Sequence, residues 1–347
     1  MNRTSLRKKT SVVAFAATLI LSTPLVAGFF GTLHPAFDSF AHFRVHLAVL
    51  MALASLPLLF GRFWKEGAMA LAFALAALAT TSVSMPVFGL GPVHAGLEPK
   101  DEEQPVYRLL QLNLRYDNPE PNKVLSLIGR LRPDVVTLDE VSGMWTEKLA
   151  LLSSAYPYRI ICPFPNQVFG VAILSARPFA EGREARCYER GSLAVAPLDL
   201  GGRSIEVAAL HLGWPWPFEQ PWQIRQLAEP LSSLAETALL AGDFNATPWS
   251  ATVARVGKMG GLTLVPSVGP TWQWHGFPDF LRFAGLPIDQ VLRKGDVLVN
   301  SARALGEAGS DHLPVLVEFS FKAPPPRPEE EAETSTAALG PALQPRG

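Results

Sequence analysis

The amino-terminal part of this 347-residue chain is apolar and carries few charges, which constrains its fold more than any other feature. An apolar run from Ser11 to Phe30 follows a basic N-terminus, and a helix needs about 20 residues to cross a bilayer core. A second run spans roughly residues 45–60, and a third extends from residue 67 to about residue 93 without a charge. We therefore predict a membrane anchor over residues 1–93, a bundle of about three transmembrane helices near 11–30, 45–60 and 67–93.

The number and direction of the crossings depend on two segments that allow another interpretation. The first run also fits a cleavable signal peptide, because basic n-regions look alike. The second run is short and contains His46 and Pro57. If all three runs span, the positive-inside rule puts everything after Val93 outside the cytoplasm, in the periplasm of a bacterium; if the second run does not span, the direction reverses. We interpret His34, His42 and His46 as residues that flank the membrane segments.

After Asp101 the chain has the composition of a soluble protein. We predict a short polar linker over residues 94–104, one domain over 105–322 and a disordered tail over 323–347, because the tail lacks apolar periodicity. The net charge is −1, so no global basic field would draw this chain to nucleic acid.

The two cysteines, Cys162 and Cys187, do not form a C-x-x-C pair, which argues against a structural zinc site. In an oxidising compartment they could form one disulfide, and two buried free thiols are the alternative. The sequence does not place their Cβ atoms, so both possibilities stay open.

Strand-like and helix-like stretches alternate between residues 105 and 322, which indicates an α/β fold. A helix is predicted over 123–131, where apolar residues recur at helical spacing, and another over 222–237, distorted at Pro230. The predicted strands cover residues 106–114, 135–138, 171–174, 205–212, 239–241 and 313–319.

Several of these apolar strands end in an acid, an amide or an imidazole, at the position where α/β folds place their sites. Hard oxygen ligands suit Mg²⁺, a carboxylate can deprotonate water, and imidazoles and amides can neutralise phosphoryl charge. A softer metal would need cysteine or clustered histidine. The set therefore suits hydrolysis of a phosphate ester. The segments are Gln111-Leu112-Asn113, Thr137-Leu138-Asp139-Glu140, Ala209-Leu210-His211, Gly242-Asp243-Phe244-Asn245, Pro287-Ile288-Asp289 and Ser310-Asp311-His312.

These segments, in this order, resemble the endonuclease/exonuclease/phosphatase superfamily, which includes deoxyribonuclease I, neutral sphingomyelinases and inositol polyphosphate phosphatases. Gly170 to Ser175 and Thr271-Trp272 are similar to its auxiliary motifs. Each tripeptide alone is a weak signal, but the ordered set covers nearly all of Pro105 to Phe321. The resemblance implies a four-layer α/β sandwich of the deoxyribonuclease I type.

The resemblance also implies a role for each residue. Glu140 would be the principal ligand of Mg²⁺ or Mn²⁺, with Asn113 beside it and Asp311 as a second metal-associated carboxylate. Asp243 would activate the attacking water. Asp139 departs from the family pattern, which commonly has glutamine there, and an extra acid could change metal affinity. The remaining predicted catalytic residues are Asn245 as a phosphate donor, His312 as a stabiliser of the transition state oriented by Asp289, and His211 as a contact to phosphate or the leaving oxygen.

The substrate is less constrained than the chemistry. Nuclease-like action is our first choice, because His211 and the Thr271-Trp272 region resemble deoxyribonuclease I. Phospholipid or sphingolipid phosphodiesterase action is the alternative, favoured by the membrane anchor, and a catalytically inactive binding module is a third reading. The aromatic loop from Trp214 to Trp222 could stack on bases, hold an acyl chain, enter the membrane interface or pack on its own domain.

Overall fold

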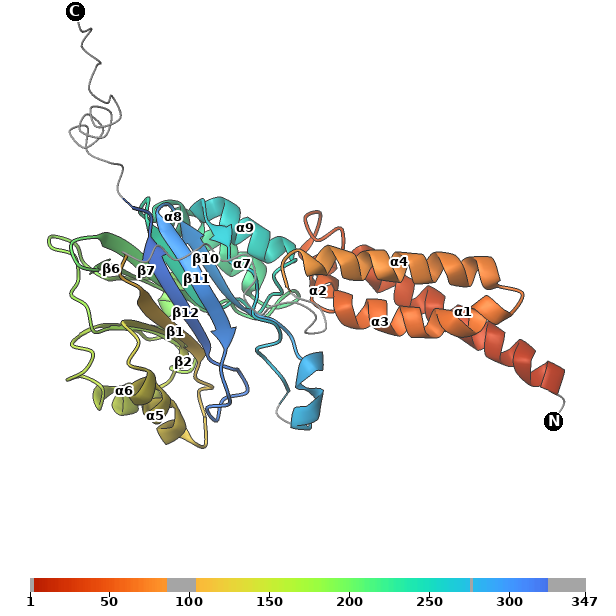
Figure 1. The fold of residues 1–347 in the computed structure, drawn as a ribbon, viewed down its shortest axis with the longest axis horizontal. Helices are drawn as coiled ribbons and strands as arrows, with labels where there is room; N and C mark the ends of the chain where they lie inside the picture. The colour runs from red at the N-terminus through yellow and green to blue at the C-terminus, as the bar shows by residue number, and fades with distance from the viewer. Residues whose placement is uncertain (1–2, 86–103, 275–276, 324–347) are drawn as a thin grey trace, which may run out of the picture.

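The computed structural model describes residues 3–85, 104–274 and 277–323 (Figure 1). The predicted linker and the predicted disordered tail fall outside the described residues, apart from residues 104 and 323 where the description resumes and stops. In the described part, a helical N-terminal bundle projects from one end of an α/β sandwich (Figure 1).

The sandwich contains two six-stranded sheets. The first sheet has the order β11-β12-β1-β2-β4-β3, and its strands are β1 (Tyr107–Asn113), β2 (Val135–Val141), β3 (Tyr158–Cys162), β4 (Gly170–Ser175), β11 (Val297–Ala304) and β12 (Val315–Phe321). The second has the order β5-β6-β7-β8-β10-β9, and its strands are β5 (Arg186–Tyr188), β6 (Leu193–Asp199), β7 (Ser204–Leu210), β8 (Ala238–Asp243), β9 (Thr263–Leu264) and β10 (Asp289–Lys294).

Each sheet is mixed, with a parallel pair near its centre. β1 runs parallel to β2 and β7 runs parallel to β8, while β12 is antiparallel to β1 and β10 is antiparallel to β8. Valine, leucine, isoleucine and alanine side chains from the inner faces of both sheets form one core, with Phe319 and Leu109 fully buried in it. Burying strands on both faces explains why their sequences are almost continuously apolar.

Helices cover the two outer faces. α5 (Pro121–Leu131) and α6 (Gly143–Ala150) pack on the first sheet, where Ile128 and Trp145 are buried. α7 (Gln220–Gln226), α8 (Ala228–Ser232) and α9 (Ala251–Gly260) pack on the second sheet. Two mixed sheets between two helical layers confirm the predicted α/β sandwich of the deoxyribonuclease I type.

The predicted helix over 222–237 is shorter and is divided into two. α7 ends at Gln226 and α8 begins at Ala228, so Pro230 lies in the first turn of a new helix. In one continuous helix its ring would clash with the carbonyl of Gln226, four residues earlier. The distortion at Pro230 was therefore predicted, but the complete break was not.

The N-terminal helices do not form three membrane-length spans. One described helical stretch, Lys9–Ala27, is long and apolar enough to cross a membrane, and a second span exists only if the bent pair Pro35–Ala41 and Arg44–Phe60 counts as one. Within the described residues, the prediction of three membrane-spanning helices is therefore wrong: one helix, or at most two, is long and apolar enough. The elements are α1 (Arg3–Ala27), α2 (Pro35–Ala41), α3 (Arg44–Ser55), η1 (Leu56–Phe60) and α4 (Trp64–Ser82).

The second and third apolar runs do not by themselves form helices long and apolar enough to span a membrane, because one is interrupted and the other has charged residues in its first turn. The second apolar run changes from α-helix to 3₁₀-helix after Ser55, next to Pro57, and is bent by 64° against α2. α4 is 19 residues long, but its first turn contains Lys65 and Glu66, which lowers its apolar content. The part of the third run beyond residue 85 lies outside the described residues.

The bundle is joined to the sandwich through α2, which lies next to α9 (Figure 1). Both carboxylate oxygens of Asp38 accept hydrogen bonds from the first turn of α9, from Ala251 N at 2.7 Å and Thr252 N at 2.8 Å. The indole of Trp249 donates to the carbonyl of Ala41 at 2.7 Å. The bundle is therefore attached to the sandwich by specific polar contacts at and just before the first turn of α9.

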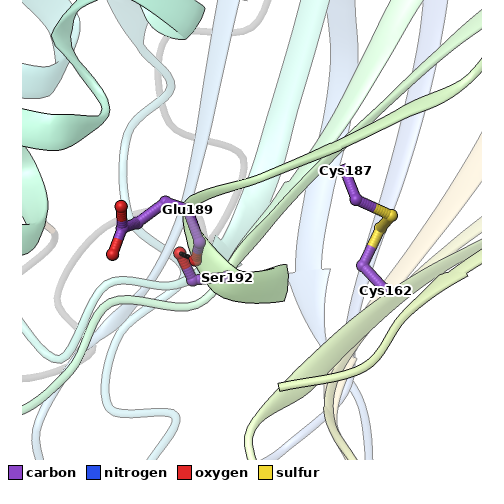
Figure 2. Close-up of a disulfide and its surroundings, with 4 residues drawn as sticks. All are labelled: Cys162, Cys187, Glu189 and Ser192. Carbon is purple, nitrogen blue, oxygen red and sulfur yellow. Dashed lines mark hydrogen bonds between the residues drawn. A yellow bond between two sulfur atoms is a disulfide. The ribbon is translucent and has the colours of Figure 1, made fainter. Parts of the chain in front are cut away.

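A disulfide links the two sheets. Cys162 at the end of β3 and Cys187 in β5 are bonded, with their Cα atoms 5.6 Å apart (Figure 2). Of the two possibilities that the sequence left open, the structure has the disulfide.

Candidate active site

The predicted site residues gather where strands from both sheets end at one edge of the sandwich. β1 delivers Asn113, β2 delivers Glu140 and β8 delivers Asp243 at or next to their carboxyl ends. β10 is antiparallel to β8, so its first residue, Asp289, pairs directly with Asp243. The two sheets thus contribute side chains to a common region.

Asn113 connects the two sheets. Its Nδ2 donates to Glu140 Oε1 at 3.1 Å and to Asp243 Oδ2 at 2.9 Å, and its Oδ1 accepts from the amide of Arg115. The side chain is fully buried, so both amide hydrogens and one carbonyl lone pair are used. Asn113 therefore holds two carboxylates from different sheets at a defined separation.

Glu140 is held in a backbone conformation that glutamate seldom adopts. Its φ is +56°, in the left-handed region, beside a register shift in the pairing of β2 with β4. The amide of Tyr116 donates to Oε2 at 2.9 Å. The side chain is only partly buried and lines an open cleft. Such strain persists where the surrounding structure imposes it, and it is concentrated at functional sites.

Asp243 is the most connected of the carboxylates. The amide of Asn245 donates to its Oδ1 at 2.8 Å, while the imidazole Nε2 atoms of His312 and His211 lie 3.6 Å and 3.8 Å from its Oδ2. Burial raises the pKa of Asp243 to about 6, against the opposing effect of His312. The carboxylate therefore sits between two imidazoles in a buried position.

His312 and Asp289 form a buried pair. Nδ1 of His312 lies 2.9 Å from Oδ2 of Asp289, whose Oδ1 accepts from Gln111 at 3.0 Å. Burial by itself lowers the pKa of His312, but the carboxylates of Asp289 and Asp243 outweigh it and raise the pKa to about 10. At neutral pH the imidazole is therefore protonated, and its Nε2–H faces Asp243.

Three predicted residues surround this network. Nδ1 of His211 lies 3.3 Å from the carbonyl of Phe169, which orients its ring. Nδ2 of Asn245 donates to the carbonyl of Leu212 at 2.8 Å, leaving its second hydrogen near Asp243. Oδ2 of Asp311 accepts from the indole of Trp272 at 3.1 Å. All of the predicted residues thus lie in one region.

Two groups of side chains are candidates for holding a divalent cation. Ligand atoms of Asp243, Asp289 and His312 lie within 4.8 Å of one another. However, Nδ1 of His312 is engaged with Asp289, and all three of these side chains are buried. Glu140 and Asp311 instead present carboxylate oxygens to the cleft, which are the hard donors that Mg²⁺ prefers. The donor set fits such an ion.

The site opens into a cleft of about 470 Å³ between the sandwich and the N-terminal helices. Catalytic candidates form one part of its lining and aromatic or aliphatic side chains form most of the rest. The lining residues are Ser39, His42, Phe43, Glu140, Trp214, Pro215, Trp216, Phe218, Asp243, Asn245, Trp272, Trp274, Leu286, Ile288, Asp311 and His312.

Comparison with known proteins agrees with this geometry. The model of the endonuclease/exonuclease/phosphatase family matches residues 110–312, a range that contains every predicted site residue. The chain belongs to this family. No curated protein sequence matches it.

Solved structures of the family share the sandwich. An endonuclease/exonuclease/phosphatase from Bacteroides vulgatus is 17% identical, with a TM-score of 0.53 over 63% of this chain and 100% of that chain. The catalytic domain of human nocturnin is 19% identical, with a TM-score of 0.51 over 63% of this chain and 96% of that chain. At these identities the likeness shows the fold alone, which is the fold of the endonuclease/exonuclease/phosphatase family.

Asp139, where the family commonly has glutamine, lies beneath the site rather than in the cleft. It is fully buried, and its Oδ2 accepts from Gln111 at 3.0 Å and from the amide of Asp243 at 2.8 Å. Burial, together with Asp243, raises its pKa well above the usual range. Asp139 therefore supports the site from below, through Gln111 and the backbone of Asp243, so an effect on metal affinity would be indirect.

Sequence reasoning missed the residues that the N-terminal helices bring to the cleft. His42 was interpreted as a membrane-flanking residue, yet its Nδ1 accepts from the amide of Thr247, 205 residues away in the chain, at 3.3 Å. His46 likewise contacts the carbonyl of Ala284 at 2.7 Å. No local sequence pattern predicts hydrogen bonds between residues so far apart in the chain. The sequence assigns Gln111 no role of its own, but in the structure its side-chain amide donates hydrogen bonds to both Asp139 and Asp289.

Proposed function

We propose that this chain is a membrane-anchored, divalent-metal-dependent hydrolase of phosphodiester bonds. One observation carries the proposal: Asn113 joins Glu140 to Asp243, while Asp289 holds His312 with its Nε2 3.6 Å from Asp243, beside an open cleft. This arrangement brings together a carboxylate that can activate water (Asp243), a protonated imidazole (His312) and a carboxylate that can bind a metal ion (Glu140). Membership of the endonuclease/exonuclease/phosphatase family supports phosphoester hydrolysis.

Each side chain would have a defined task. Water would lose a proton to Asp243 as its oxygen bonds to phosphorus, one P–O ester bond would break, and the leaving oxygen would take up a proton, giving a phosphomonoester and an alcohol. His312, oriented by Asp289, would offset the charge that develops on the phosphoryl oxygens. His211 would contact the phosphate or the leaving oxygen, and Asn245 would donate to phosphate. A Mg²⁺ or Mn²⁺ ion held by Glu140 and Asp311, with Asn113 beside them, would polarise the phosphoryl group.

We also propose that the catalytic part lies outside the cytoplasm. The stretch Lys9–Ala27 is the best candidate for a membrane-spanning anchor, and a single crossing there, with the basic N-terminus in the cytoplasm, puts the sandwich outside. In this arrangement the bent pair Pro35–Ala41 and Arg44–Phe60 does not cross the membrane. Cleavage of Lys9–Ala27 as a signal sequence would leave the sandwich on the same side. The disulfide between Cys162 and Cys187 supports an oxidising compartment, because cytosolic thiols are kept reduced.

Nucleic acid and phospholipid are the two substrate classes that the motifs suggest, with nuclease-like action first from sequence. The Thr271-Trp272 region was part of the reason for ranking nuclease-like action first, but in the structure both residues hold acidic residues of the site in place. Thr271 accepts from the amide of Asp289, and Trp272 donates to Asp311. A catalytically inactive binding module is disfavoured, because a binding role alone does not require this network of carboxylates and imidazoles.

A test can separate the two roles assigned to the carboxylates. We expect the full chain in detergent to hydrolyse bis(p-nitrophenyl) phosphate when Mg²⁺ or Mn²⁺ is added and to lose turnover in EDTA. Asp243→Ala should lower turnover by about 10²–10⁴-fold, the usual contribution of a general base, while Mn²⁺ still binds. Glu140→Gln should lower both turnover and Mn²⁺ affinity, measured by calorimetry.

The matched control is Glu147→Gln, which removes an exposed glutamate from α6 and should change neither quantity. Turnover that is independent of metal, or that survives Asp243→Ala, would contradict the mechanism. Unchanged Mn²⁺ affinity in Glu140→Gln would remove Glu140 from the metal site and leave the hydrolase assignment standing.

A further inference from the structure

The cleft above the site has two chemically different parts. Its polar part consists of the catalytic candidates described above, which are Glu140, Asp243, Asn245, Asp311 and His312. The larger part is apolar, with Trp214, Trp216 and Phe218 of the aromatic loop on one side and Phe43 of the N-terminal helices on another. These aromatic side chains are 47–57% exposed, so about half of each is available to an occupant of the cleft.

The charges of the lining argue against a polyanionic occupant. A groove that follows a nucleic-acid backbone combines stacking platforms with positive charge, because each phosphate must be neutralised. Among the described residues that line this cleft, none is lysine or arginine, and the three carboxylates of Glu140, Asp243 and Asp311 outnumber the one imidazolium described above, that of His312. One phosphoester can be neutralised at the site itself by a metal and His312. A chain of further phosphates would meet apolar walls.

We propose that the occupant is a phospholipid, whose phosphodiester meets the catalytic carboxylates while its acyl chains lie between the aromatic loop and the N-terminal helices. The inference rests on the proposed function and names the substrate class of the same site. An amphipathic molecule with one phosphodiester matches both parts of the cleft, because the hydrophobic effect favours placing alkyl chains against exposed aromatic rings.

The position of the cleft beside the candidate membrane anchor supports the same substrate. One wall consists of Ser39 of α2 and of His42 and Phe43, which follow α2, and α2 belongs to the bent helix pair that is apolar enough to enter a membrane. Exposed aromatic side chains continue from the cleft around the junction of the bundle and the sandwich, as they do in the interfacial belts of membrane proteins. These residues are Phe37, Phe40 and Phe43 near α2, Trp274, and Phe280 and Phe283 of η4 (Asp279–Ala284).

The wall from the bundle is held in place by hydrogen bonds. Ser39 Oγ donates to the carbonyl of Trp216 at 2.9 Å, which ties α2 to the aromatic loop. His42 is bonded to Thr247, two residues after Asn245. His46 contacts η4 through Ala284, so the exposed phenylalanines of η4 stand beside α3. The cleft is therefore preformed between the anchor and the active site, and a lipid could reach the carboxylates without leaving the membrane surface completely.

The proposal is tested with the full chain and three kinds of substrate. The first is vesicles that contain phosphatidylcholine, phosphatidylethanolamine, phosphatidylglycerol and sphingomyelin, with products identified by mass spectrometry. The second is short-chain, monomeric forms of the same lipids, and the third is a single-stranded oligonucleotide. We expect at least one vesicle lipid to be hydrolysed with a higher kcat/KM than its short-chain form, and the oligonucleotide to be a poor substrate.

Trp214→Ala combined with Trp216→Ala should lower kcat/KM on vesicles by roughly tenfold per ring, one tenfold step being about 1.4 kcal/mol. The loss on the short-chain form should be several-fold smaller. Trp222→Ala is the matched control. The structure puts Trp222 in α7, outside the part of the aromatic loop from Trp214 to Phe218 that lines the cleft, and the side chain is 41% exposed.

Each outcome decides a different question. Three results would overturn the lipid assignment. The first is an equal loss of kcat/KM on vesicles and on short-chain lipid, and the second is an equal loss in Trp222→Ala. The third is a higher kcat/KM for the oligonucleotide than for the lipids. So would hydrolysis of bis(p-nitrophenyl) phosphate without hydrolysis of any of the four lipids. If bis(p-nitrophenyl) phosphate is not hydrolysed with added metal either, the proposed function itself fails.

Discussion

At the scale of single residues, Gly242 shows how a backbone contact positions a catalytic side chain. A Cβ atom on Gly242 would overlap the carbonyl oxygen of Leu210, in the neighbouring parallel strand. The obstacle is backbone, so no rotamer change can relieve it. Only glycine lets β8 approach β7 this closely, and the next residue on β8 is Asp243.

We expect Gly242→Ala to lower the free energy of unfolding by about 2 kcal/mol, within the range of overpacked cores, and to displace Asp243 so that turnover falls as well. Thermal unfolding and the bis(p-nitrophenyl) phosphate assay measure the two effects. Gly129→Ala is the control, because Gly129 lies in α5 and a Cβ atom added there would have no neighbour within 4 Å. There the substitution should stabilise the helix by about 0.5–1 kcal/mol. A Gly242→Ala variant as stable and active as the parent would refute the close-approach argument.

At the scale of elements, the N-terminus of α9 is completed by a residue from another part of the chain. Ser250 caps the amide of Val253, as local sequence allows. The preceding amides, of Ala251 and Thr252, are instead bound by Asp38 of α2, more than 200 residues earlier in the chain. The carboxylate also lies at the positive end of the helix dipole. One buried acid thus caps α9 and attaches the bundle.

Asp38→Ala should lower the free energy of unfolding of the full chain by about 2 kcal/mol, because two backbone donors would lose their charged acceptor. Since α2 carries Ser39 and is followed by His42, the wall of the cleft should loosen as well, and limited proteolysis should cut faster between the bundle and the sandwich. Glu66→Ala, which removes an exposed acid from α4, serves as the comparison. Equal stability and equal proteolysis of the two variants would show that Asp38 does not attach the bundle.

At the scale of the whole molecule, the anchor, the sandwich and the disulfide must be consistent with one location. Cys162 and Cys187 are 25 residues apart and connect the two sheets at their edges (Figure 2). Closing a loop of this size contributes about 3 kcal/mol in the chain-entropy model. That contribution is available only where thiols can be oxidised.

We expect a reporter fused after residue 322 to be active as alkaline phosphatase and non-fluorescent as a cytoplasmic fluorescent protein. In the same cells, both cysteines should resist alkylation until a reductant is added. Free thiols together with a fluorescent fusion would place the sandwich in the cytoplasm and contradict the proposed location. Cys162→Ser with Cys187→Ser should lower stability by about 3 kcal/mol without changing the fusion result.

The α/β fold and the grouping of the candidate site residues followed from sequence because their signals are local. An apolar strand that ends in Asn113, Glu140 or Asp243 can be recognised within a few residues, and the carboxyl ends of neighbouring strands must meet at one edge of a sheet. The order of the motifs along the chain then identified the family. The prediction of one helix over 222–237 was wrong in part, because the sequence shows the distortion at Pro230 but not whether the helix bends or breaks there.

Only the tertiary structure decided how distant segments meet. The pairing of Cys162 with Cys187, the bond from His42 to Thr247 and the cap that Asp38 provides for α9 join residues far apart in sequence. The number of membrane-length helices also depended on breaks at the ends of apolar runs rather than on their composition. Sequence by itself determined which polar side chains stand at the strand ends, because periodicity and strand order impose their positions. The cleft, and with it the substrate that the site can take, depends on packing between two domains, which no local pattern encodes.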